Sequence, residues 1–68
     1  MTKYVAYVFD GQQVVKRVPL ANEKAAREYM ESMAIVMMVD DYTFVPNVKN
    51  ELTYSSGRFY VKLLPELH

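Results

Sequence analysis

The sequence has 68 residues, of which 51% are hydrophobic, and its eight basic side chains balance eight acidic ones. This length allows a single domain, residues 1–68, with one small core, and the hydrophobic fraction argues against intrinsic disorder. The balanced charge excludes a global electrostatic attraction to nucleic acid or anionic membranes. The absence of cysteine excludes disulfides and thiolate metal sites.

No targeting or membrane segment is predicted. The longest apolar run, Met33 to Val39, has seven residues, far fewer than the roughly 20 that span a bilayer. The N-terminus lacks the charged and apolar regions of a signal peptide. Together with the missing cysteines, these features predict a cytoplasmic protein.

The chain opens with a predicted β-hairpin. Lys3 to Phe9 is rich in β-branched and aromatic residues, Asp10-Gly11 favours a tight turn, and Gln12 to Val18 is the returning strand. The first strand is apolar on both faces, which predicts a central position in the sheet. The second carries two basic residues and ends at a proline, which predicts an edge.

Two registers are open for this hairpin. A two-residue loop would place Tyr7 opposite Val14, whereas a four-residue loop would place Phe9 opposite Val14 and Val8 opposite Val15. The longer loop is favoured because it pairs apolar residues with apolar residues.

The segment from Asn22 to Val39 is the only predicted helix, with Asn22 as N-cap and a start near Glu23. Its end is open, because Ile35 to Val39 fits either a last buried turn or an extended segment before Asp40. We expect the apolar stripe of the helix to pack on a sheet, with Met33 buried between the two. The stripe consists of Ala26, Tyr29, Met30, Met33 and Met37.

Two further strand regions follow the helix. Tyr42 to Val45 is a short predicted strand that ends at a Pro46-Asn47 turn. The last hairpin turns at Ser56-Gly57, where we expect a positive φ at Gly57. Its register is predicted by the complementary cross-strand pairs Tyr54 with Phe59, Leu52 with Val61 and Glu51 with Lys62.

These elements predict an α+β fold in the order β-β-α-β-β-β, with one helix packed on a small, mainly antiparallel sheet. One helix cannot cover both faces, so the other face is predicted to stay open and rich in tyrosine. We expect a non-enzymatic interaction module that binds, and occludes, a protein partner through this open face or an edge strand. The predicted partner-binding residues are Tyr4, Tyr7, Lys16, Arg17, Tyr60 and Lys62.

The alternative function is binding of single-stranded nucleic acid, with tyrosines as stacking platforms beside the basic residues. The segment from Gly57 to Leu63 matches the aromatic strand of RNA-recognition domains only at Gly57, Tyr60 and Val61. The sequence has few candidate catalytic residues, because the only histidine is His68 and there is no glycine-rich phosphate loop. No cofactor or metal site is predicted.

The run from Met33 to Val39 also predicts self-association. If this run is helical, Ile35 and Met38 point away from the stripe that faces the sheet. A second copy related by a two-fold axis is the simplest cover for such residues in a short chain. We therefore expect a homodimer with Ile35 or Met38 in its interface.

In size, neutral charge, absence of cysteine and its ββα start, the chain resembles the small accessory proteins that bacteriophages encode to inhibit host enzymes or defence complexes. The resemblance covers the whole layout and includes no motif. It implies a protein-binding role and assigns no functional residue.

Overall fold

The computed structural model describes residues 2–66 and contains, within that range, four β-strands and one α-helix. In chain order these are β1 (Lys3–Asp10), β2 (Gln13–Leu20), α1 (Glu23–Val36), β3 (Asn50–Thr53) and β4 (Phe59–Glu66). The predicted α+β class is confirmed. His68 lies outside the described residues.

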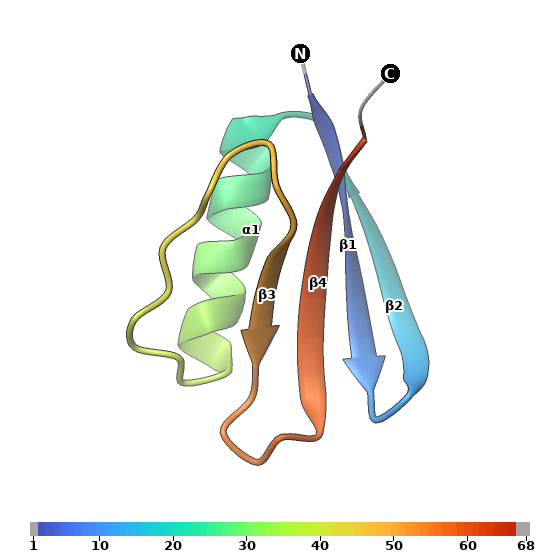
Figure 1. Ribbon diagram of the computed structural model, residues 1–68, viewed down its shortest axis with the longest axis vertical. Coiled ribbons are helices and arrows are strands. Elements are labelled where there is room, and N and C mark those ends of the chain that lie inside the picture. Colours follow the sequence, from blue (N-terminus) through green and yellow to red (C-terminus); the bar gives the residue numbers. More distant parts are fainter. Residues whose placement is uncertain (1, 67–68) are drawn as a thin grey trace.

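The four strands form one antiparallel sheet in the order β2-β1-β4-β3, with α1 packed against one face (Figure 1). β1 is central and β2 is an edge, as predicted. The core lies between α1 and the sheet face it covers, and its best buried large side chains are Tyr4, Met30, Val61 and Leu63.

The β1–β2 hairpin closes on the pair Asp10 and Gln13, so its loop has two residues. The favoured four-residue loop is therefore wrong, although Phe9 does lie opposite Val14 as that alternative predicted. The next pair is wrong, because Val8 lies opposite Lys16. A β-bulge leaves Val15 without a partner at this point, and it moves the rest of β2 by one residue relative to β1.

α1 begins where predicted, because the Asn22 side chain accepts a hydrogen bond of 2.8 Å from the Ala25 amide. The helix ends at Val36, and Met38 then adopts a left-handed conformation with φ of 56°. The Val39 amide donates to the Ala34 carbonyl at 2.8 Å, which completes a Schellman-type cap. The predicted extended alternative for this segment is therefore wrong.

The helix stripe is shifted slightly from the predicted one. Met33 is only half-buried, whereas Met30 is fully buried and Ala34 is 6% exposed. The line that faces the sheet runs through residues four positions apart, so Met33 lies on its flank. The central position between helix and sheet belongs to Met30.

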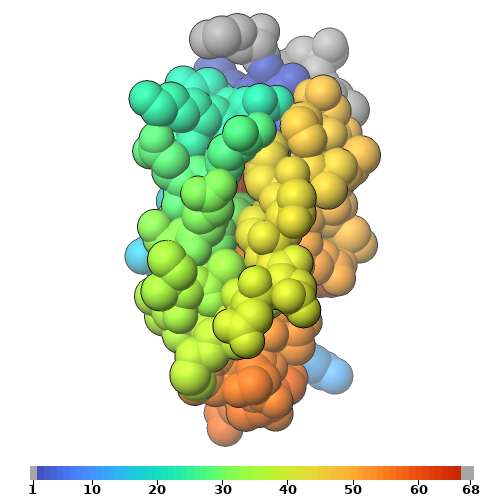
Figure 2. Space-filling model, turned by 90° about the vertical axis from the view of Figure 1, so that its left-hand side faces the viewer, coloured from blue at the N-terminus to red at the C-terminus, as the bar shows by residue number. Residues whose placement is uncertain are grey.

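Tyr42 to Val45 forms a loop, not the predicted strand, so the element order is β-β-α-β-β. The side chain of Asn50, which is 5% exposed, holds this loop by accepting from the Val45 amide and donating to the Val45 and Val48 carbonyls. These bonds replace a strand partner for the loop backbone. Figure 2 shows the loop, in yellow, lying alongside α1, in green.

The β3–β4 hairpin has the predicted register, with Leu52 opposite Val61 and Glu51 opposite Lys62. The Tyr54 amide donates to the Phe59 carbonyl at 2.8 Å, and the two rings meet edge to face with centroids 6.5 Å apart. Gly57 has φ of 80°, as predicted.

Candidate functional site

The sheet face that α1 does not cover is the main candidate site, and we call it the open face. Its centre is built by the two central strands, because alternate residues of a strand point to the same side. β1 contributes Val5, Tyr7 and Phe9, and β4 contributes Tyr60, Lys62 and Leu64. Val5 is only 3% exposed although it lies on this face, because it sits between Pro19 and Leu64 of the neighbouring strands.

An aromatic pair in contact with a lysine side chain occupies one half of the open face. The rings of Phe9 and Tyr60 are stacked, with centroids 4.5 Å apart and planes inclined by 8°. The Lys62 ammonium lies 5.5 Å from the centroid of each ring, within cation–π range. Each ring therefore has one face covered by the other, and Lys62 is held against both.

Carboxylates lie opposite most of the basic side chains of the open face. In the sheet register, Lys62 of β4 lies opposite Glu51 of β3, and Lys3 of β1 lies opposite Glu66 of β4. Glu51 also contacts the Lys49 ammonium at 2.8 Å, and this hydrogen bond lowers the pKa of the Glu51 carboxyl. These carboxylates therefore offset part of the positive charge of the open face.

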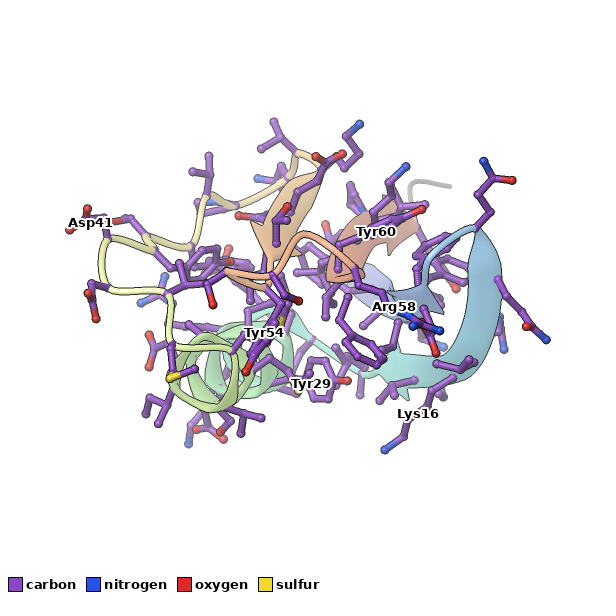
Figure 3. The ribbon with its side chains drawn as sticks, turned by 90° about the horizontal axis from the view of Figure 1, so that it is seen from below. Lys16, Tyr29, Asp41, Tyr54, Arg58 and Tyr60 are labelled. Atoms are coloured by element: carbon purple, nitrogen blue, oxygen red, sulfur yellow. The ribbon has the colours of Figure 1, made fainter. Side chains whose placement is uncertain are left out.

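Four of the six predicted partner-binding residues share the open face. Tyr7 lies opposite both Arg17 and Lys62, and Tyr60 lies in the adjacent pair. Figure 3 shows Tyr60 on the side of the sheet away from α1. The structure brings these four side chains together, and their role in binding stays a prediction.

The predicted placement of Tyr4 on an accessible surface is wrong. Tyr4 is 1% exposed, because even-numbered residues of β1 face the helix. Its ring packs edge to face on Phe44 with centroids 5.9 Å apart, and its hydroxyl accepts a hydrogen bond from the Asn47 amide at 3.1 Å. Tyr4 therefore has a structural position that no partner reaches.

The predicted placement of Lys16 on the open face is also wrong. Lys16 lies opposite Val8, whose side chain packs on the core, so Lys16 points to the helix side (Figure 3). The bulge at Val15 separates it in orientation from Val14, and Arg17 takes the open-face position.

A second surface lies at the end of the molecule that carries the hairpin tips and the C-terminal end of α1. It contains a groove of about 380 Å³, which we call the apolar groove, and exposed side chains of the helix end. Ile35 is 79% exposed and Met38 is 63% exposed, as the helical pattern predicted. The apolar groove is lined by Val8, Met33, Val36, Met37, Tyr54, Phe59 and Val61.

Sequence reasoning missed the apolar groove because its walls come from three separate elements. The sequence predicts Tyr54 and Phe59 as a cross-strand pair, but it does not show that the helix stops short of them. α1 ends at Val36, and the chain then turns away, so Phe59 keeps 42% of its surface exposed. The only sequence signal is the excess of apolar residues between Met33 and Val39.

The described residues offer little that resembles a reaction centre. Between residues 2 and 66, no group of three or more His, Asp or Glu side chains is arranged to hold a metal ion. The strongest perturbation of a titratable group is at Tyr42, where burial and the nearby Glu31 carboxylate raise the pKa to about 12. A tyrosine with a raised pKa stays protonated at neutral pH, so it is a poor general base.

No protein-family model matches the chain, and comparison with curated proteins and with solved structures gave no match. In the described part of the chain, no helix has the length and apolar character needed to cross a membrane.

Proposed function

We propose that this chain is a small non-enzymatic module that binds a protein partner on its open face and acts by occluding the partner's surface. The observation that carries the proposal is the uncovered strip of aromatic and aliphatic side chains at the centre of the sheet. Tyr7, Phe9, Tyr60 and Leu64 form this strip. Contiguous apolar surface rimmed by charged residues is typical of protein interfaces, and tyrosine and arginine are enriched at their centres.

The edge strands are weaker candidates than the open face. An added strand needs a row of free backbone donors and acceptors along the edge. β2 is interrupted by the bulge at Val15 and by Pro19, which has no amide hydrogen, and β3 has only four residues.

The geometry of the aromatic pair favours a protein partner over nucleic acid. A base stacks on an aromatic ring whose face is free. Phe9 and Tyr60 stack on each other, and Lys62 already lies against both rings. The cross-strand carboxylates of Glu51 and Glu66 also reduce the positive field that a phosphate backbone needs.

Binding of single-stranded nucleic acid remains the alternative, because Tyr7, Arg17, Tyr60 and Lys62 do share one face. A labelled oligothymidine and a labelled oligouridine, titrated at low and at physiological salt, test it. Tight binding that weakens steeply with salt and is lost in Tyr60→Ala would support this alternative.

Site-specific crosslinking tests the protein partner directly. A benzophenone side chain in place of Tyr60 should crosslink one defined protein in an extract of the native host. The same probe in place of Val48, which is 47% exposed in the loop before β3, should not crosslink that protein. Equal crosslinking from both positions would contradict binding on the open face. An unchanged crosslinking yield from the Tyr60 position after Arg17→Ala would contradict it as well.

We also propose a cytoplasmic, reducing setting and a role like that of phage accessory proteins. The cysteine-free composition supports the first, and the small size and ββα start support the second.

A further inference from the structure

The end of the molecule that holds the apolar groove leaves large apolar side chains in water. Ile35, Val36 and Met38 are 79%, 69% and 63% exposed, and they stand beside the groove that runs between the end of α1 and the β3–β4 hairpin. The surface thus has protruding side chains next to a depression of similar chemistry. This combination allows the surface to be complementary to itself.

The cap of α1 keeps one of these side chains at the surface at an energetic cost. Met38 occupies the left-handed position of the Schellman-type cap, with φ of 56°, where glycine is the usual residue. A side chain in this conformation is strained, and strain of this kind often accompanies a functional role. Most of Met38 faces water within the monomer, because the residue is 63% exposed.

The two margins of this end differ in charge. Asp40 and Asp41 follow the C-terminal end of α1, whose last turn contains no basic residue to offset its free carbonyls. Lys16 and Arg58 lie on the other side, where Arg58 is ion-paired with Asp10 of the same chain, so Lys16 carries the positive charge of this margin. Figure 3 shows this end directly, with Asp41 at one margin, Tyr54 near the middle, and Arg58 and Lys16 toward the opposite margin.

A two-fold axis that passes between the protruding end of α1 and the apolar groove would exchange these two margins. The acidic margin of one copy would then face the basic margin of the other, while the uncharged centres meet. A surface with a single sign of charge would repel its own copy, but this one attracts it. The second copy would also bring a cation to the negative end of α1, which lacks one in its own chain.

We propose that this end of the molecule is a two-fold interface with a second copy of the chain. Ile35 and Met38 of one copy occupy the apolar groove of the other, and Asp41 lies near the Lys16 of its partner copy. This interface is separate from the open face, so the dimer presents two open faces and the proposed partner binding does not depend on it.

Sedimentation equilibrium across micromolar concentrations tests the interface. The wild-type chain should have twice the monomer mass, and Ile35→Glu should be folded by circular dichroism but monomeric, because a charge would be placed in an apolar contact. Val48→Glu is the matched control, since Val48 is an exposed apolar residue just before β3, beyond the end of that strand opposite to the β3–β4 turn, and it should stay dimeric. A wild-type monomer, or a dimeric Ile35→Glu, would overturn the proposal.

Exchanging the charges of Asp41 and Lys16 tests whether the two copies are arranged around the proposed two-fold axis. Asp41→Lys alone should weaken the dimer by about tenfold or more, because it places a lysine against the partner copy's Lys16. The double variant Asp41→Lys with Lys16→Glu should restore the wild-type dissociation constant. Failure of this restoration would overturn the two-fold arrangement, even if the single variants weaken association.

Discussion

Asn50 offers a direct test of how the loop between α1 and β3 is held. Its side chain makes four hydrogen bonds: it accepts from the Tyr42 hydroxyl and the Val45 amide and donates to the Val45 and Val48 carbonyls. Asn50→Ala removes all four, each worth about 0.5–1.5 kcal/mol net. Water can replace some of them, because Val45 and Val48 are about half exposed. We therefore expect the free energy of unfolding to fall by roughly 2–4 kcal/mol.

Asn50→Asp separates hydrogen bonding from packing, because it keeps the size and the acceptors but loses the donor. At neutral pH its carboxylate would face the Val45 and Val48 carbonyls, so this variant should be at least as unstable as Asn50→Ala. It should regain stability at acidic pH, where the introduced carboxyl is protonated and can donate again. Lys49→Ala is the control and should cost little, because the ion pair of Lys49 with Glu51 is exposed.

Urea denaturation at several pH values measures these differences, and amide hydrogen exchange locates them. Exchange should accelerate first in the Val45 amide, while the central strands keep their protection. A change below about 0.5 kcal/mol in Asn50→Ala would refute the reasoning, as would wild-type stability of Asn50→Asp at neutral pH.

Three further predictions concern the core, the last turn and alkaline pH. Met30→Ala should lower the free energy of unfolding by roughly 2–5 kcal/mol and Met33→Ala by clearly less; equal losses in urea denaturation would mean that the stripe is misassigned. Gly57→Val should destabilise by about 1–2 kcal/mol through backbone strain alone, because no atom lies within 4 Å of the position that a Cβ at residue 57 would take. An unchanged melting temperature would argue against the positive φ. The pKa of Tyr42 is raised to about 12 in the folded state, so the unfolded chain loses this proton first and stability should fall from about pH 10 to 12. Urea denaturation of Tyr42→Phe should show a shallower fall over that range, and an identical pH profile would contradict the assignment.

Local signals in the sequence predicted the elements that depend on neighbouring residues. Asn22 caps α1 through an atom three residues away, and Gly57 supplies a turn within one hairpin. The register of the β3–β4 hairpin followed from side-chain complementarity, which leaves one good alignment.

The features that sequence reasoning missed depend on distant residues or on near-equal alternatives. The sequence gives no large energy difference between pairing Val8 with Val15 and pairing Val8 with Lys16, so it could not predict the bulge. Tyr42 to Val45 has strand-like composition, but its backbone bonds to a side chain of β3. Tyr4 could be assigned to a face only once the face covered by α1 was known.

The two central strands come from opposite ends of the described chain, with Tyr4 paired to Pro65 and Val8 paired to Val61. The β1–β2 hairpin and α1 use local contacts and can form on a microsecond scale, but the pairing of β1 with β4 must first overcome the entropy of closing nearly the whole chain. Topologies with such distant contacts fold slowly for their size. We therefore expect the arrival of β4 to limit the folding rate, and until it arrives β1 exposes a hydrogen-bonding edge to any other strand nearby.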